Sequence, residues 1–310
     1  MNKGDRIFVA GHRGLVGSAI VRKLRAGGYE NLILTGHDSL DLRRQEAVER
    51  FFAAERPDHV LMAAARVGGI LANDRYRADF IRDNLLIQTN VIDAAYRHGT
   101  KKLLFLGSSC IYPKFAPQPI KEEYLLSGPL EPTNQPYAIA KIAGVEMVSA
   151  YRDQYGFHGI NLMPTNLYGP NDNFDFQTSH ALAALIRRFC EAERTKASEV
   201  VVWGTGATRR EFLHVDDMAE ACLFAMREYD EREPLNVGVG EDITIRELAE
   251  LVGDVAGFRG TLRFDLTKPE GTPRKLLDVS RIHALGWRAR IPLRAGIAET
   301  YRWYAENAPA

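Results

Sequence analysis

Tyr137 and Lys141 are separated by three residues. Side chains at positions i and i+4 share one face of a helix, so we expect the phenol and the ammonium to lie side by side. An ammonium beside a phenol favours the phenolate and lowers the pKa of the phenol from its ordinary value of about 10. Tyr137 would then exchange a proton near neutral pH, as a ketone reductase requires when hydride addition leaves an alkoxide. The pair alone is a weak signal, because this spacing also occurs by chance on exposed helices.

A glycine-rich turn near the N-terminus provides the matching cofactor signal. The apolar residues 6–10 are typical of a buried parallel strand, and Gly11, Gly14 and Gly17 follow them. A helical apolar pattern comes next and ends near residue 27. Strand, glycine turn and helix are the context of a dinucleotide site, in which the backbone approaches a pyrophosphate at the helix N-terminus. The spacing G-x-x-G-x-x-G differs from the more common G-x-G-x-x-G, so taken alone it could also be a plain turn.

The composition is that of an ordinary globular protein. Among 310 residues, 45% are hydrophobic and 26% are charged, with 40 basic residues balancing 40 acidic ones. This balance gives no reason to expect nucleic acid or a membrane as a partner, and no segment is typical of a signal peptide or a bilayer span. Cys110, Cys190 and Cys222 have no disulfide or zinc spacing, which favours a cytoplasmic protein without a metal. Cys190 and Cys222 lie on predicted helices, where we expect them in the core.

Short apolar runs alternate with helical patterns along the first 170 residues. We expect strands at residues 6–10, 32–35, 59–62, 102–106 and 160–163, and helices at residues 15–24, 45–55, 75–97 and 137–155. Repeated β-α units predict an α/β fold with a doubly wound, mostly parallel Rossmann sheet. Ligands bind such sheets at the carboxyl ends of the strands. Residues 11, 63–65, 108–110 and 164–166 each follow a strand, so we expect them to meet at one crevice.

After about residue 170 the alternation becomes less regular. We expect helices at residues 181–192, 216–227, 243–255 and 295–305, and strands at residues 199–203, 212–214, 235–237 and 262–265. We therefore divide the chain into a Rossmann domain, residues 1–170, and a smaller mixed α/β substrate domain, residues 171–310. Segments near residues 210–237 are expected to return to the first domain.

Longer motifs carry a family resemblance. They are Gly-Ser-Ser-Cys-Ile-Tyr-Pro at residues 107–113, Met-Pro-Thr-Asn-Leu-Tyr-Gly-Pro at residues 163–170 and Trp-Gly-Thr-Gly at residues 203–206. With the glycine turn and the Tyr-Lys pair, they make the chain similar to extended short-chain dehydrogenase/reductases and, more narrowly, to the GDP-L-fucose synthase family, over residues 6–287. The resemblance implies a GDP-sugar substrate, epimerisation at C3 and C5 beside a C4 ketone, and reduction of that ketone by NADPH. It also implies a homodimer formed through the helices near residues 75–97 and 137–155.

The resemblance implies roles for five residues. It assigns proton exchange at C3 and C5 to Cys110 and His180. It assigns contact with the C4 oxygen to Ser108, and the reduction to Tyr137 with Lys141. Hydroxyl groups can stabilise an enolate oxygen, and a thiolate and an imidazole can exchange protons on opposite faces of a sugar. Each assignment has a structural alternative: Cys110 could be a buried small residue, His180 could occupy a helix entrance, and Ser108 could satisfy backbone groups in its turn.

The cofactor is expected to be NADP(H). An acidic residue after the second strand normally binds the ribose of NAD, whereas a basic group accepts the phosphate of NADP. Arg13 is well placed for that phosphate, although Asp38 could favour NAD instead. With the resemblance, the predicted cofactor-binding residues are Gly11, His12, Arg13, Gly14, Leu15, Val16, Gly17, Asp41, Leu106, Gly107, Ser108, Ser109, Lys141, Pro164, Thr165, Asn166, Leu167 and His180.

The resemblance also places four residues around the nucleotide sugar. These are Arg188, Trp203, Arg210 and Glu270, the last at a position where the family usually has Asp. Arg188 could pair with a diphosphate and Trp203 could stack on a ring. As alternatives, Arg187 could face inward instead, Trp203 could be ordinary packing, and Arg210 could form a surface ion pair.

Two other functions remain open from the sequence. One is a nucleotide-sugar epimerase or dehydratase that holds NAD tightly and shows no net redox change. A dehydratase usually carries two acidic residues near the position of Ser108, whereas this chain has Cys110-Ile111-Tyr112 there. The other is a non-catalytic NADP-binding protein, against which the complete set of Ser108, Tyr137 and Lys141 argues.

Overall fold

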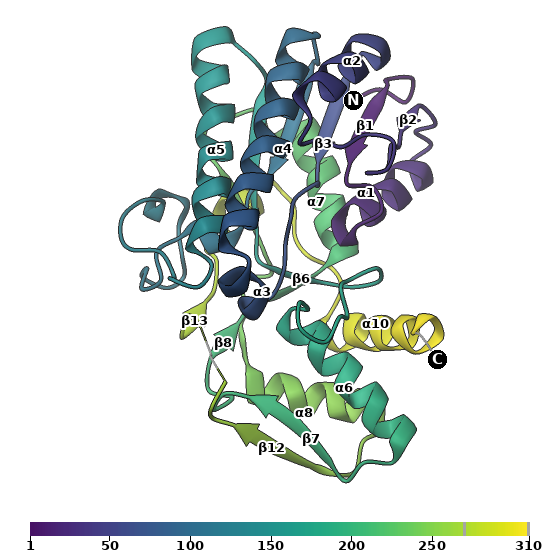
Figure 1. Cartoon of the computed structure of the whole chain (residues 1–310), viewed down its shortest axis with the longest axis vertical. Coiled ribbons are helices and arrows are strands. Elements are labelled where there is room, and N and C mark those ends of the chain that lie inside the picture. Colours follow the sequence, from purple (N-terminus) through teal and green to yellow (C-terminus); the bar gives the residue numbers. More distant parts are fainter. Residues whose placement is uncertain (269–270, 309–310) are drawn as a thin grey trace.

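The protein is built around a parallel sheet. A computed structural model describes residues 1–268 and 271–308 of the chain. Six strands pair in the order β10-β5-β4-β3-β1-β2, and each neighbouring pair is parallel (Figure 1). Their bounds are β1 (Ile7–Ala10), β2 (Leu32–Ile33), β3 (His59–Met62), β4 (Lys102–Leu106), β5 (Gly159–Pro164) and β10 (Leu235–Val237).

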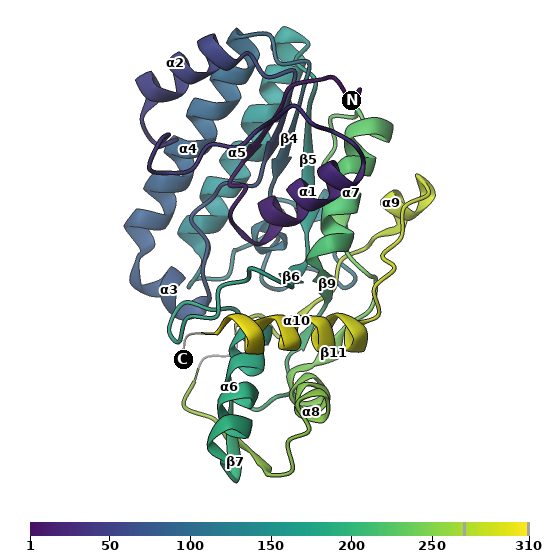
Figure 2. The same ribbon diagram turned by 90° about the vertical axis from the view of Figure 1, so that its right-hand side faces the viewer.

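Helices cover both faces of this sheet. Helices α2, α4 and α5 lie on one face, and α1 and α7 lie together on the other (Figure 2). Their bounds are α1 (Leu15–Ala26), α2 (Gln45–Glu55), α4 (Arg77–Arg97), α5 (Gln135–Tyr155) and α7 (Val215–Glu228). Strands β1, β3 and β5 are buried at every residue because both of their faces are covered, which explains their apolar sequences. The predicted α/β fold with a doubly wound parallel sheet is confirmed.

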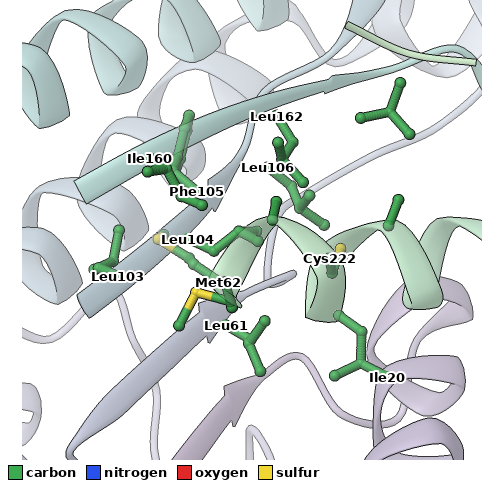
Figure 3. Close-up of a cluster of buried hydrophobic side chains, with 14 of the residues drawn as sticks. Ile20, Leu61, Met62, Leu103, Leu104, Phe105, Leu106, Ile160, Leu162 and Cys222 are labelled. Atoms are coloured by element: carbon green, nitrogen blue, oxygen red, sulfur yellow. The ribbon is translucent and has the colours of Figure 1, made fainter. Parts of the chain in front are cut away.

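The main hydrophobic core fills the space between the sheet and its helices. Figure 3 shows side chains of β3 and β4, such as Leu61 and Leu104, beside Ile20 of α1 and Cys222 of α7. Cys222 has no exposed surface, as expected for a core cysteine, and burial raises the pKa of its thiol. Its contribution is therefore packing rather than chemistry.

A second, smaller hydrophobic core lies below the sheet in Figure 1. It is formed by α6 (Ala181–Thr195), α8 (Ile245–Ala256) and α10 (Leu293–Asn307), with the parallel pair β7 (Glu199–Trp203) and β12 (Thr261–Asp265). Tyr168, which precedes residue 170, belongs to this second core, whereas α7, β10 and Trp287 belong to the first. The division of the chain into two domains at residue 170 stays an interpretation, because both cores draw on residues from both sides.

Short strands join the two parts. Strand β6 (Asn166–Tyr168) pairs with β9 (Phe212–His214), and β8 (Arg209–Arg210) pairs with β11 (Ile243–Thr244) and β13 (Arg274–Lys275). The remaining elements are short helices: α3 (Ile70–Arg75), η1 (Ser109–Ile111), η2 (Glu122–Tyr124) and α9 (Ser280–Ala284).

Several expected boundaries are wrong. The helix expected at residues 75–97 is α4, which begins at Arg77; a separate short helix, α3, precedes it, and the backbone at Tyr76 between them leaves the helical region. The helix expected from residue 243 begins at Ile245, because Ile243 and Thr244 pair with β8 and Thr244 caps the helix. The second strand covers only Leu32–Ile33. At the start of α8, a tertiary contact thus overrides the local pattern.

Candidate active site

A cavity of about 870 Å³ opens at the carboxyl ends of the central strands. Its wall combines the glycine turn after β1, the residues that follow β3, β4 and β5, and parts of α6, β7 and β8. All the predicted cofactor-binding residues line it, as do Cys110, Tyr137, Arg188, Trp203 and Arg210. The expected meeting of the strand ends is therefore observed. Which of these residues touch a ligand stays a prediction, and Glu270 lies outside the described residues.

The glycine turn brings backbone close to backbone. Gly11 has a φ of +82°, and a Cβ atom there would lie 2.8 Å from the backbone of Ala64. A Cβ atom on Gly17 would overlap the carbonyl oxygen of Gly11. Helix α1 starts after Gly14 without a capping side chain and without an acidic residue in its first turn. Its first N–H groups and its dipole therefore favour an anion at this end of the cavity.

Basic side chains line the cavity beyond this turn. Arg13 passes Gly36 so closely that a Cβ atom on Gly36 would lie 3.0 Å from the guanidinium carbon. Arg43 donates to Asp41 through Nε and Nη2, both at 2.9 Å, and this contact lowers the pKa of Asp41 to about 2. Arg43 lines the cavity, although the sequence pattern did not point to it, whereas Asp38 lies outside the wall. This arrangement favours a phosphate over a bare ribose in this region.

Lys141 is buried between α5 and β4. Its side chain is 3% exposed, its Nζ donates to the Leu106 carbonyl oxygen at 2.8 Å, and it lies 4.7 Å from the centre of the Phe105 ring. Burial lowers the pKa of Lys141 to about 7. Helix α5 approaches β4 this closely because Gly144 lacks a side chain: a Cβ atom there would overlap Phe105 and lie 2.8 Å from Gln88 Oε1.

The expectation that Lys141 lowers the pKa of Tyr137 is wrong in this structure. Burial raises the pKa of Tyr137, and negative charge on Cys110 raises it further, whereas a hydrogen bond with Ser108 lowers it. The physical reason is that Lys141 donates to a backbone carbonyl and itself loses charge through burial, so it gives the phenolate little support. Tyr137 is half-buried at the cavity wall, with its ring edge-on to Phe80.

Ser108 and Cys110 lie in the η1 turn directly after β4. The Ser108 hydroxyl accepts a hydrogen bond of 3.1 Å from the Cys110 N–H, so part of its role is to cap this turn. The same hydroxyl acts on Tyr137, whose pKa it lowers, and both residues line the cavity. Cys110 is half-buried, unlike Cys222, and Lys275 Nζ lies 3.4 Å from its sulfur. The alternative that Cys110 is a core cysteine is therefore wrong.

His180 ends a loop that is fixed by its own hydrogen bonds. The Asp175 carboxylate accepts from the backbone of Thr178 at 2.9 Å, and the Thr178 carbonyl accepts from Gly69 at 2.7 Å. His180 is the N-cap residue of α6, as the structural alternative anticipated, but its side chain makes no capping bond and lines the cavity. Burial, and then the charge of Lys275, lower the pKa of its imidazole.

Trp203 and Arg188 lie together at the far end of the cavity. Arg188 donates to the Val201 carbonyl oxygen at 2.9 Å, and its guanidinium carbon lies 4.9 Å from the centre of the Trp203 ring. Lys268 Nζ lies 5.6 Å from the same ring. Arg187 is buried and bonds Phe174 instead, so Arg188 is the arginine that reaches the cavity.

Arg210 lines the cavity beside its neighbours on β8 and β9. Arg209 forms an ion pair with Asp242 at 2.7 Å, and Arg210 lines the cavity. Glu211 is fully buried and accepts from the N–H groups of Val239 and Leu277 at 2.6 and 3.0 Å. Burial nonetheless raises the pKa of Glu211. This carboxylate ties together three segments, two of which line the cavity, at Arg210 and at Lys275.

Over residues 1–268 and 271–308, no group of three or more His, Cys, Asp and Glu side chains could hold a metal ion. The same part of the chain contains no helix that is long and apolar enough to cross a membrane.

Comparison with known proteins gives an independent view of the chain. A model of the NAD dependent epimerase/dehydratase family matches residues 7–238. GDP-L-fucose synthase 1 of Arabidopsis thaliana is 62% identical over 306 residues, which cover 99% of this chain and 95% of that protein. GDP-L-fucose synthase of Escherichia coli is 55% identical over 98% of this chain and 97% of that protein.

The fold is also shared with solved structures. The structure of a GDP-L-fucose synthetase from Naegleria fowleri bound to NADP superposes with a TM-score of 0.92 at 29% sequence identity. The match covers 99% of this chain and 96% of that one. The likeness in sequence and the likeness in fold therefore both extend over nearly the whole chain.

Proposed function

The chain belongs to the NAD dependent epimerase/dehydratase family and, within it, to the GDP-L-fucose synthases, and we propose that it makes GDP-L-fucose in a multifunctional site. Its substrate is GDP-4-keto-6-deoxy-D-mannose, which it epimerises at C3 and C5 and reduces at C4. The observation that carries this proposal is the meeting of Ser108, Cys110, Tyr137, Lys141 and His180 in the cavity that holds the glycine turn.

The cavity fits NADP(H). The tightly packed turn at Gly11, Gly14 and Gly17, with the uncapped N-terminus of α1, suits a pyrophosphate, and Arg13 and Arg43 suit the adenosine phosphate. When bound, NADPH supplies the hydride that reduces the C4 carbonyl. Lys141 and Asn166 also line the cavity and are held by hydrogen bonds, since Lys141 bonds the Leu106 carbonyl oxygen and Asn166 Nδ2 bonds the Glu211 carbonyl oxygen at 2.7 Å.

The epimerisations use two hydroxyl groups, that of Ser108 after β4 and that of Tyr137 in the first turn of α5. The Ser108 and Tyr137 hydroxyls can donate to the C4 oxygen and stabilise the enolate that forms when a proton leaves C3 or C5. Cys110 is the base that removes the proton, and His180 returns a proton on the opposite face. Desolvation inside the cavity, and then the charge of Lys275, lower the pKa of His180, so its imidazolium releases a proton more readily than a free imidazolium does.

The reduction uses the same polarised carbonyl. Tyr137 gives its phenolic proton to the C4 alkoxide, which is a stronger base than a phenolate. Lys141, whose pKa of about 7 lets its Nζ hold or release a proton at neutral pH, is one helical turn away and assists the return of that proton. At the far end, Arg188 and Arg210 supply positive charge for the diphosphate, and Trp203 supplies a flat surface for the nucleotide.

We also propose a cytoplasmic homodimer formed through α4 and α5. Tyr96 of α4 stacks on Tyr155 of α5 with ring centres 4.5 Å apart, and Leu86 and Tyr155 are 41% and 46% exposed. Apolar exposure on two adjacent helices supports burial against a second copy. The three cysteines are free, which suits a reducing compartment. Sedimentation at micromolar concentration tests the dimer, and a monomer would contradict it.

The proposed function is tested by product analysis. Purified protein is incubated with GDP-4-keto-6-deoxy-D-mannose and either NADPH or NADH, and the product is identified by NMR. We expect GDP-L-fucose, one equivalent of NADPH consumed, and a higher kcat/KM with NADPH than with NADH. An epimerised ketone with no net redox change would instead indicate an epimerase or dehydratase. Cofactor binding without turnover of the keto-sugar would indicate a non-catalytic protein.

A further inference from the structure

Lys275 contacts the sulfur of Cys110. Its Nζ lies 3.4 Å from Cys110 Sγ, within hydrogen-bonding distance for a sulfur acceptor. Lys275 is the last residue of β13 and Cys110 lies in the η1 turn, so the contact joins segments 165 residues apart. Both side chains are half-buried and both line the active-site cavity. No pattern in the sequence assigns a role to Lys275.

The backbone around Lys275 is firmly held. The Lys275 carbonyl oxygen accepts from the Glu211 N–H at 3.2 Å, and the Leu277 N–H donates to the buried Glu211 carboxylate at 3.0 Å. The Leu276 N–H donates to Gln118 Oε1 at 2.9 Å. A lysine on such an anchored strand keeps its ammonium at the sulfur at a lower cost in entropy than a lysine on a loose loop.

Other titratable and charged groups share this part of the cavity. Tyr137 comes from α5, His180 from the start of α6, Arg210 from β8 and Asp172 from the loop after β6. Tyr137 interacts with the charge on Cys110, and His180 interacts with the charge on Lys275. Lys275 thus interacts with both groups to which we assign proton exchange.

We propose that Lys275 is a positioning residue for the epimerisations: its ammonium holds the Cys110 sulfur at the cavity wall and stabilises the thiolate. This inference rests on the proposed function. In the step, the thiolate takes the proton from C3 or C5, an S–H bond forms as the C–H bond breaks, and the electron pair moves to the C4 oxygen. Ser108 and Tyr137 stabilise that oxygen, and Lys275 keeps its own proton throughout.

Thiol alkylation tests the contact without any sugar. Iodoacetamide is added to the protein over a range of pH, and modification of Cys110 is followed by peptide mass spectrometry. An opposite charge within about 4–6 Å favours the charged form by about one pH unit or more. Because the ammonium that attracts the thiolate is lost, and the remaining thiolate is the better nucleophile, we expect Lys275→Met to slow alkylation of Cys110 near pH 7 about threefold. Lys275→Arg should restore the wild-type rate.

Arg274→Met is the matched control, because it removes a cation from the neighbouring position, where the side chain pairs with Asp242. It should leave the alkylation of Cys110 unchanged. Lys275→Gln provides a second uncharged variant if Lys275→Met does not fold. An unchanged alkylation profile in a folded, uncharged variant overturns the inference, and so does failure of Lys275→Arg to restore the rate.

Deuterium exchange separates this inference from the proposed function. In D2O, Lys275→Met should exchange C3 and C5 of the keto-sugar about tenfold more slowly than wild type. Slow exchange that is accompanied by unchanged alkylation would show that Lys275 acts on the sugar and not on Cys110, which overturns the inference alone. If wild-type protein exchanges neither position, the proposed function fails, whatever the alkylation profile shows.

Discussion

Replacing Lys141 with methionine should stabilise the protein at neutral pH while removing its reductase activity. The Lys141 ammonium is buried, and burial lowers its pKa from 10.5 to about 7. Between these two pH values the unfolded chain binds a proton that the folded protein does not bind. The free energy of unfolding therefore rises with pH from about 7 to 10.5. Burial of Lys141 destabilises the folded protein by its full amount only below about pH 7.

The size of the effect follows from the same values. Lowering a pKa from 10.5 to about 7 corresponds to roughly 5 kcal/mol, at about 1.4 kcal/mol for each pKa unit. Methionine has a similar length and no charge, but it gives up the hydrogen bond to the Leu106 carbonyl oxygen, which costs about 1–2 kcal/mol. The net expectation for Lys141→Met is a gain of about 3 kcal/mol at pH 7. Near pH 10.5 we expect a loss of about 1 kcal/mol.

Urea unfolding at pH 7 and pH 10.5 measures this difference, and NADPH oxidation measures the activity. Lys121→Met is the control, since its side chain is 49% exposed and its loss should change the free energy of unfolding by less than about 0.5 kcal/mol. The reasoning is refuted if Lys141→Met destabilises the protein at pH 7. It is also refuted if the variant changes stability equally at both pH values.

Three further substitutions test other parts of the site. Gly144→Ala should lower the free energy of unfolding in urea by about 1–3 kcal/mol despite the better helix propensity of alanine, because the new Cβ atom would overlap Phe105; equal or greater stability would contradict this packing. Tyr137→Phe should slow NADPH oxidation about 100-fold or more by removing the proton donor, and an unchanged rate would show that Tyr137 is misassigned. Arg13→Ala should reduce kcat/KM for NADPH about tenfold or more, while kcat/KM for NADH changes little; an equal loss with both cofactors would rule out a phosphate contact.

The sequence was sufficient to predict those helices and strands whose bounds depend on their own residues. Strands β3 and β4 have the bounds that the sequence predicts, residues 59–62 and 102–106, and their apolar residues are buried because helices cover both faces of the sheet. Helix α5 ends at Gly156, whose φ of +66° allows the left-handed cap that glycine favours. The glycine turn and the residues after β4 and β5 meet because parallel strands present their carboxyl ends at one edge of the sheet.

The sequence was insufficient where distant segments decide the outcome. The strands β8 and β13 contain two residues each, so no periodicity could reveal that they pair. The contact of Lys275 with Cys110 depends on that pairing and on the buried Glu211. Likewise, the sequence position of Lys141 predicted which face of the helix it occupies. Only the structure shows that Lys141 is buried deeply enough to lose much of its charge, so that it does not lower the pKa of Tyr137.

The central claim is that one polarised carbonyl in this cavity passes through both epimerisations and the reduction. The most direct measurement runs the complete reaction in D2O with NADPH and locates deuterium in the product by NMR. We expect GDP-L-fucose that carries deuterium at C3 and C5 and protium at C4, and we expect Cys110→Ser to abolish exchange at both carbons. A reduced product without deuterium at C3 and C5, or unchanged exchange in Cys110→Ser, would contradict the claim.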